Sequence, residues 1–213
     1  MDENLSELER LELAKKWWRE NYQPILSGAL IAIVVVGGWR YWQYRVEARG
    51  EAASTLFAQL SAALAQHDQA AATKLGDQIM KDYDDTAYAS QAAFALAQLE
   101  ATAGKLDDGE QKLDWVMQHS KDDGLKLLAR LRLARLQLAA GNAQAAVDSL
   151  GGADAGGFAP LYAELKGDAY AKLGKTDEAR AAYKQALDAW TDTLGDRSLV
   201  QMKLDALGQK AAK

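Results

Sequence analysis

The sequence predicts an all-α protein, with a single transmembrane helix followed by a superhelix of about four helical hairpins and a C-terminal capping helix. Three observations predict this class. An uncharged, largely apolar run lies between Glu20 and Arg40. Beyond it, Ala, Leu, Gln, Lys and Glu dominate, without the apolar–polar alternation that is typical of strands. A short turn between two apolar-periodic stretches then recurs along the rest of the chain.

The first segment, residues 1–20, is predicted to be a short N-terminal extension that includes a helix. Leu5, Leu8, Glu12 and Leu13 have helical spacing, and acidic residues precede basic ones, which suits the helix dipole. We expect this segment to be cytoplasmic. Four basic residues precede the apolar run and three follow it closely, so the positive-inside rule favours that side only slightly.

Residues 21–44 are predicted to be a membrane anchor. A bilayer core of roughly 30 Å requires about 20 mostly apolar residues in a helix. The stretch from Ile25 to Trp39 supplies the apolar part, and aromatic residues extend it at both ends. Such rings favour the headgroup layers, so four of them are predicted to be membrane-interface residues: Trp17, Trp18, Trp39 and Trp42.

Two alternatives to an anchor are a cleaved signal peptide and a buried core helix. A signal peptide needs small residues just past its apolar run, whereas bulky Trp39, Arg40, Tyr41 and Trp42 stand there. A core helix would not need so long an uncharged stretch with aromatic residues on both sides. The prediction is therefore a single-pass membrane protein.

Residues 45–213 are predicted to form the repeat domain. Turns at Gly104, Gly141 and Gly174, with His67 as a degenerate first member, are separated by 37, 37 and 33 residues. A repeat of about 34 residues made of two helices is typical of tetratricopeptide-like hairpins, which stack because none buries its apolar face alone. Gly141 and Gly174 are expected to end their helices in left-handed caps. A terminal helix over Ser198 to Leu207 is expected to cap the stack.

The fourth hairpin shows the expected packing register most clearly. Small Gly167 and Ala179 fall where the facing helices must approach closely, and Tyr183 falls where the gap is filled. The third hairpin has, at the same distances from its turn glycine, Ala134, Ala146 and Leu150. In the second, Ala97 and Leu113 do so, but Gly109 replaces the alanine.

The chain resembles the YfgM family of bacterial inner-membrane proteins. The resemblance rests on Lys15-Lys-Trp-Trp-Arg-Glu-Asn21 before the apolar run, on Gly38-Trp-Arg-Tyr-Trp-Gln43 after it, and on the helical repeats that follow. It implies a bacterial inner-membrane protein with a cytoplasmic N-terminus and a periplasmic repeat domain. It also implies an ancillary subunit of the SecYEG translocon that acts beside the membrane-anchored chaperone PpiD and helps to pass translocated proteins to periplasmic chaperones.

The sequence offers no site for catalysis, a cofactor or a metal. There is no cysteine, and His67 and His119 match no zinc-ligand spacing. No nucleophile elbow or phosphate-binding loop occurs. A formal net charge of −5 gives no support to nucleic-acid binding. The chain is therefore predicted not to be an enzyme.

Stacked hairpins present a surface lined by their first helices, and such surfaces hold segments of partner proteins. Residues at equivalent distances from the turn of each hairpin are predicted to lie on this surface. They give seven candidate partner-binding residues: Phe57, Phe94, Gln98, Leu131, Arg135, Glu164 and Asp168. Their mixture of apolar and polar side chains suits broad contact with unfolded or membrane-protein segments. The predicted function is thus a non-enzymatic adaptor. The alternative is a membrane-anchored regulatory module that sequesters a signalling protein, and a membrane-bound hydrolase is a third and weaker reading.

Overall fold

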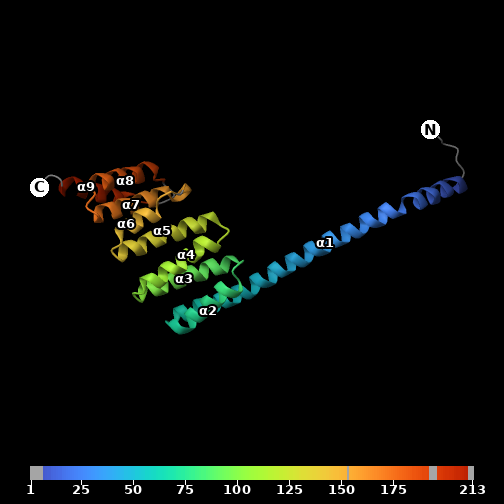
Figure 1. The fold of residues 1–213 in the computed structure, drawn as a ribbon, viewed down its shortest axis with the longest axis horizontal. Helices are drawn as coiled ribbons and strands as arrows, with labels where there is room; N and C mark the ends of the chain where they lie inside the picture. Colours follow the sequence, from blue (N-terminus) through green and yellow to red (C-terminus); the bar gives the residue numbers. More distant parts are fainter. Residues whose placement is uncertain (1–6, 153, 192–195, 211–213) are drawn as a thin grey trace. The chain divides into compact units, whose positions relative to one another are not determined.

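The computed structural model describes residues 7–152, 154–191 and 196–210, and within these ranges it contains helices and no strand. The predicted all-α class is confirmed (Figure 1). The elements are α1 (Glu7–Ala65), α2 (Gln69–Asp82), α3 (Ala87–Thr102), α4 (Leu106–His119), α5 (Asp123–Ala139), α6 (Ala143–Ser149), the 3₁₀ turn η1 (Gly156–Phe158), α7 (Ala159–Lys172), α8 (Thr176–Ala189) and α9 (Ser198–Lys210). By its internal contacts the chain divides into two units, Met1–Arg49 and Gly50–Lys213.

The first unit contains the apolar part of α1. This helix includes a stretch long and apolar enough to cross a membrane, and none of that stretch is buried within the protein. Two of its polar side chains are satisfied locally, since the Asn21 amide donates to the Trp17 carbonyl at 2.8 Å and the Ser27 hydroxyl to the Pro24 carbonyl at 2.9 Å. Such internal satisfaction is what a helix in hydrocarbon requires.

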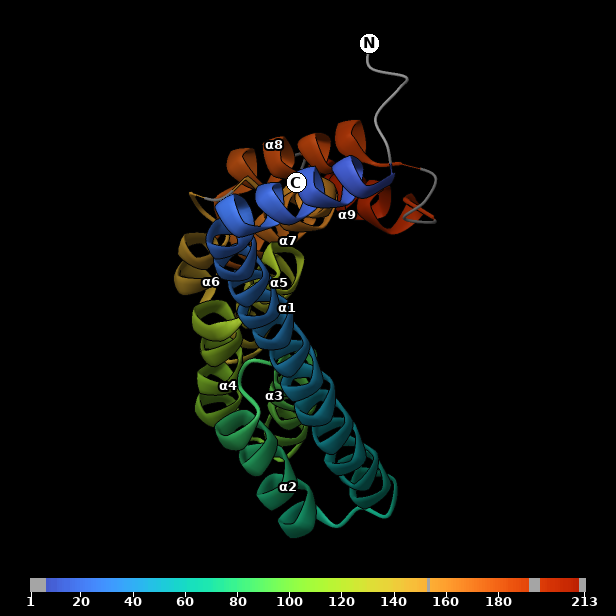
Figure 2. The same cartoon turned by 90° about the vertical axis from the view of Figure 1, so that its right-hand side faces the viewer.

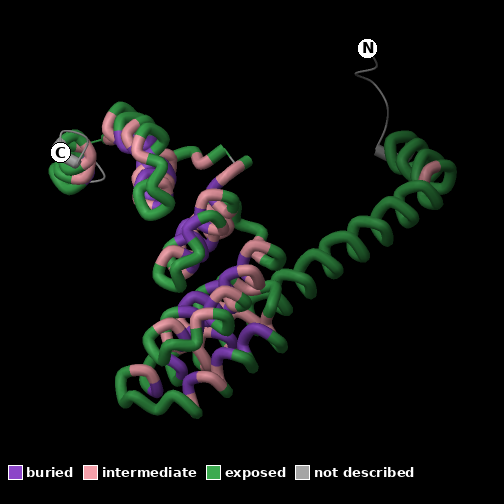
Figure 3. The backbone as a smooth tube through the Cα atoms, turned by 60° about the vertical axis from the view of Figure 1, so that its left-hand side comes forward, coloured by how far each residue is buried: buried purple, intermediate pink, exposed green. Residues whose placement is uncertain are grey.

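The second unit is a series of helical hairpins. The first hairpin is the end of α1 and α2, joined by a turn at His67. The others are α3 with α4, α5 with α6, and α7 with α8, and the two helices of each pack on one another (Figure 2). Buried residues gather on the faces where these helices meet (Figure 3). They form three apolar clusters: the first joins α1 to α5, the second α5 to α7, and the third α7 to α9. Each hairpin therefore packs on its neighbours, as expected of stacked repeats.

The four hairpin turns share one backbone geometry. His67, Gly104, Gly141 and Gly174 have φ angles of 57°, 79°, 88° and 75°. The amide after each of them donates to a carbonyl five residues back, as from Asn142 to Gln137 at 2.8 Å and from Asp68 to Ala63 at 2.9 Å. This is the Schellman motif, which satisfies carbonyls at a helix end. The predicted left-handed caps are confirmed, and His67 occupies the same position as the three glycines.

The predicted packing register is also confirmed. Ala97, Ala134 and Gly167, each seven residues before its turn glycine, are buried, as are Leu113, Leu150 and Tyr183, each nine residues after it. A Cβ added to Gly167 would lie 2.4 Å from the Tyr183 ring, so only glycine fits against this tyrosine. In the first hairpin Leu60 and Gly76 stand at these positions, and the space beside Gly76 is filled by Leu96 of α3.

The C-terminal helix α9 packs on the last hairpin. Val200 is 1% exposed and shares the third cluster with Tyr183 and Ala186. The Lys203 ammonium lies 2.7 Å from a Glu164 carboxylate oxygen and 2.8 Å from one of Asp168, and the Tyr183 hydroxyl donates to Asp168 at 2.7 Å. The predicted capping helix is confirmed, with three more residues at its end.

The left-handed turns lead to a first prediction. His67→Gly should raise the free energy of unfolding by about 0.5–1 kcal/mol, because the left-handed conformation costs an L-residue roughly 1–2 kcal/mol and glycine gives back part of this through its unfolded-state entropy. Gly141→Ala should lower it by about 1 kcal/mol. Urea unfolding of the full chain in detergent, followed by circular dichroism, measures both changes.

Gly157→Ala is the matched control, since Gly157 lacks a positive φ and has open space where a Cβ would stand. It should leave stability almost unchanged. Equal losses in Gly141→Ala and Gly157→Ala would contradict the role given to the turn.

A second prediction concerns Lys203. Lys203→Met keeps an aliphatic side chain but leaves Glu164 and Asp168 without their cation, which should cost about 1 kcal/mol at this partly exposed position. Amide exchange in α9 should therefore accelerate about fivefold. Hydrogen–deuterium exchange read by mass spectrometry measures this, with Lys184→Met, at an exposed position of α8, as the control. If both variants exchange alike, the apolar contact of Val200 alone holds α9.

The ion pairs of Lys203 also determine how the docking of α9 changes with pH. Burial opposes the charge on Lys203, but its hydrogen bonds to Asp168 and Glu164 outweigh burial and raise its pKa. A raised pKa in the folded state gives stability that is complete below the usual lysine pKa and disappears as the pH rises through the raised value. The contribution of the Lys203 charge to the docking of α9 should therefore be constant around neutral pH and be lost in strongly alkaline solution.

Candidate partner-binding site

The seven predicted partner-binding residues all lie on the first helices of the hairpins, but they differ in accessibility. Gln98 and Arg135 are exposed. Phe57, Glu164 and Asp168 are half-buried. Phe94 is 8% exposed and Leu131 only 1%. The predicted set therefore divides into residues that a partner can reach and residues that support the fold.

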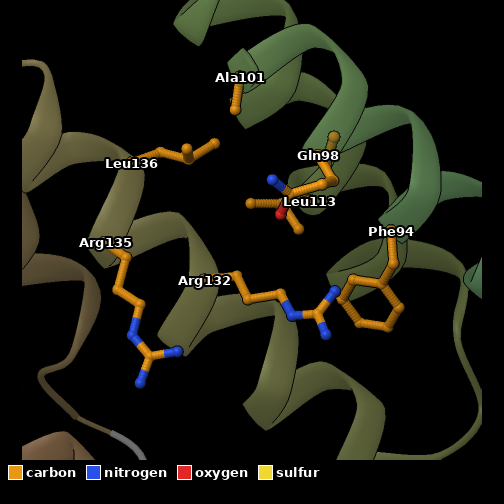
Figure 4. Close-up of a pocket in the computed structure, with 8 residues that line it drawn as sticks. Phe94, Gln98, Ala101, Leu113, Arg132, Arg135 and Leu136 are labelled. Atoms are coloured by element: carbon orange, nitrogen blue, oxygen red, sulfur yellow. The ribbon is translucent and has the colours of Figure 1, made fainter. Parts of the chain in front are cut away.

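Three of the predicted residues converge on one cavity. Phe94 and Gln98 from α3 and Arg135 from α5 line a cavity of about 280 Å³ between two successive hairpins (Figure 4). Its other walls are Ala97, Ala101, Leu113, Arg132 and Leu136. We call this the α3–α5 pocket. It combines an apolar floor with three polar side chains, which is a common composition for a binding site.

Arg132 was not predicted from the sequence, yet it is central to the pocket. Its guanidinium carbon lies 4.5 Å from the centroid of the Phe94 ring, and Figure 4 shows the side chain reaching across to that ring. Such cation–π contact partly stabilises a desolvated charge. The pKa of Arg132 is lowered by burial and, to a smaller extent, by the positive charge of Arg135.

The two arginines carry uncompensated charge. Across residues 7–152, 154–191 and 196–210, the ion pairs join other side chains, and no carboxylate lies within salt-bridge distance of Arg132 or Arg135. The chain as a whole has a formal net charge of −5. A local surplus of positive charge on an acidic protein favours an anionic ligand at this place.

Leu131 does not face the surface, contrary to its predicted position. It is 1% exposed and packs in the second apolar cluster with Tyr162 and Leu165 of α7. The residue ten positions before the turn glycine therefore serves the contact between α5 and the next hairpin. Sequence offsets alone could not place it, because the tilt between successive hairpins decides which residue of a helix face is covered.

Phe57, Glu164 and Asp168 lie outside the pocket. Phe57 packs against Tyr88 of α3, with ring centroids 5.8 Å apart. Glu164 and Asp168 already hold Lys203 of α9, as described above. Partner binding by these three residues stays a prediction, and the contacts of Glu164 and Asp168 show that α9 occupies their surface.

The two histidines have structural surroundings. His67 is the left-handed turn residue of the first hairpin. His119, the last residue of α4, has Nδ1 2.9 Å from the Trp115 carbonyl oxygen, and its ring stacks on Trp115 at 4.4 Å. Among the described residues, no three His, Cys, Asp or Glu side chains are grouped to hold a metal ion.

The four predicted membrane-interface residues are exposed on α1. Trp17, Trp18, Trp39 and Trp42 are between 52% and 59% exposed, and the rings of Trp39 and Trp42 lie 5.5 Å apart. Large exposed indole rings at both ends of an apolar helix suit the two headgroup layers of a bilayer. Their assignment to the membrane interface stays a prediction.

Comparison with known proteins finds relatives that match almost the whole chain. It is 29% identical over 97% of its length to the whole "Ancillary SecYEG translocon subunit" of Neisseria gonorrhoeae. It is also 29% identical over 95% of its length to the protein of that name from Aggregatibacter actinomycetemcomitans, of which 98% is covered, and 25% identical over 95% of its length to that of Escherichia coli, of which 97% is covered. The resemblance predicted from the juxtamembrane residues and repeats is thus confirmed. The model of the tetratricopeptide repeat-like domain matches residues 15–209, and the chain belongs to that family.

Proposed function

We propose that the protein is a non-catalytic, single-pass inner-membrane adaptor of the SecYEG translocon. The observation that carries this proposal is the extent of the similarity. Relatives named as ancillary subunits of that translocon match 95–97% of the chain, so the similarity covers both the apolar part of α1 and the repeats. Similarity confined to the repeats would say little, because such hairpins serve many unrelated partners.

In this proposal the first unit anchors the protein in the membrane and the second unit binds partner proteins. In this proposal residues 1–20 are cytoplasmic, residues 21–44 span the inner membrane, and residues 45–213 are periplasmic. The exposed indoles of Trp18 and Trp42 support a fixed depth of the anchor in the bilayer. An anchored domain meets other membrane-bound proteins at a high effective concentration, so weak contacts suffice for association.

The repeat domain would supply contacts to proteins that leave the translocon. Its hairpins present the α3–α5 pocket, and a binding surface of this kind supports short-lived contact with extended or helical segments. We propose that translocated proteins and the membrane-anchored chaperone PpiD are its partners. The adaptor would hold a translocated protein near the membrane until a periplasmic chaperone receives it.

Site-specific photocrosslinking in intact cells tests this proposal. A photoreactive residue at Trp42 should yield adducts with translocon subunits, because that position lies at the end of the predicted span. The same probe at Arg135 should yield adducts with translocated proteins or periplasmic chaperones. Gln185, which is exposed on α8 and outside the pocket lining, is the matched control and should give few adducts. Adducts only with cytosolic proteins would overturn the proposal in favour of a cytoplasmic regulatory module.

The orientation can be measured separately because the chain has no cysteine. Glu12→Cys and Gln185→Cys each introduce one thiol, at exposed positions on opposite sides of the predicted span. A membrane-impermeant maleimide added to spheroplasts should label only Gln185→Cys, and both variants after lysis. Labelling of Glu12→Cys alone before lysis would reverse the proposed orientation.

A further inference from the structure

The last hairpin shows how this domain binds a helix at the end of its stack. Glu164 and Asp168 lie ten and six residues before the turn glycine Gly174, and both carboxylates contact the ammonium of Lys203. Lys203 belongs to α9, a separate helix that also buries Val200. The surface at these two positions therefore accepts a helix that presents an opposite charge beside an apolar side chain.

The same positions in the middle of the stack carry the opposite charge. Phe94 and Gln98 stand ten and six residues before Gly104, and Arg135 stands six residues before Gly141. Arg132, one helical turn before Arg135, adds a second guanidinium at the α3–α5 pocket. Within the described ranges no side chain supplies a carboxylate to either arginine, in contrast to the pairing that Lys203 finds on α7.

Two arginine charges that face the same pocket without a carboxylate among the described residues indicate a site for an anionic ligand. Arg132 is half-buried, and this burial lowers its pKa. The like charge of Arg135 lowers the pKa further. Contact with the Phe94 ring stabilises its charge only in part. A carboxylate between the two guanidinium groups would remove the repulsion and accept charge-assisted hydrogen bonds from both.

The walls of the pocket favour a protein segment over a free anion. Phe94, Leu113 and Leu136 offer apolar surface beside the arginines, and the cavity of about 280 Å³ has room for side chains. A phosphate or a lipid headgroup would leave this apolar surface in water. Long polyanions would also be repelled by a chain of net charge −5.

We propose that the α3–α5 pocket binds an acidic helical segment of a partner protein, with a carboxylate between Arg132 and Arg135 and a neighbouring apolar side chain against Phe94 and Leu136. The pairing of α9 with α7 is repeated here with the charges exchanged and with the helix supplied by another protein. This inference rests on the proposed function only in taking the repeat domain as the part that binds partners.

Fluorescence anisotropy with the full chain in nanodiscs of zwitterionic lipid tests the proposal. The probe is a fluorescein-labelled, alanine-rich peptide of about 14 residues, long enough to be partly helical. It carries Glu and Leu four positions apart, so that both lie on one face. A matched peptide has Gln in place of Glu. The Glu peptide should bind, and the Gln peptide should bind about tenfold more weakly.

Single substitutions on α5 then locate the site. Arg132→Gln and Arg135→Gln should each weaken binding of the Glu peptide about tenfold and leave binding of the Gln peptide unchanged. Arg130→Gln is the matched control, because Arg130 lies on the same helix and outside the pocket lining. It removes the same charge and should change binding less than twofold. Arg135 is exposed, so its substitution leaves the core intact.

Three results would overturn the proposal: no binding of the Glu peptide, equal binding of the Glu and Gln peptides, or an equal effect of Arg130→Gln and Arg135→Gln. If anionic lipid vesicles displace the labelled peptide and an excess of unlabelled Glu peptide does not, the pocket would instead be assigned to lipid headgroups. None of these results bears on adducts formed at Trp42. A failure of this inference is therefore distinguishable from a failure of the translocon assignment.

Discussion

The close approach of the two helices in each of the last three hairpins is the constraint on which the repeat domain depends. Small residues seven positions before the turn make it possible, most strictly at Gly167, where the Tyr183 ring leaves no space for a Cβ. The left-handed turn then reverses the chain without losing the hydrogen bonds of the helix end. Repetition of this unit aligns the first helices, and the α3–α5 pocket exists because two of them, with α4 behind, leave a space between successive hairpins.

Much of the fold could be predicted because its signals are local. The uncharged run, the turn glycines and the small residues act within one helix or one hairpin, where spacing along the chain determines spacing in space. His67 was identified only as a degenerate turn, since a histidine at positive φ has no firm sequence signature. Convergence of Phe94, Gln98 and Arg135 followed from the repeat register, which places equivalent residues of successive hairpins beside one another.

The remaining site features depend on contacts between distant residues. Leu131 is buried because of how α7 lies on α5, and Arg132 reaches Phe94 because of how α5 lies on α3. Lys203 meets residues 35 and 39 positions earlier in the chain. Helix tilt and side-chain reach decide these contacts, and neither is encoded in residue spacing. The sequence could therefore indicate the helices that carry the site, but not which of their charges remain unpaired.

The division of the core into three apolar clusters has a consequence for how the domain opens. The third cluster is confined to α7, α8 and α9, whereas Leu113 and Leu136 in the pocket walls belong to the first. In a linear array each part is held only by its neighbours, so the free energy of opening is graded along the chain. The C-terminal end can fray and re-form while the middle hairpins stay folded. Mechanical pulling or proteolysis at the C-terminal end would therefore unfold or cleave the last hairpin before it affected the pocket.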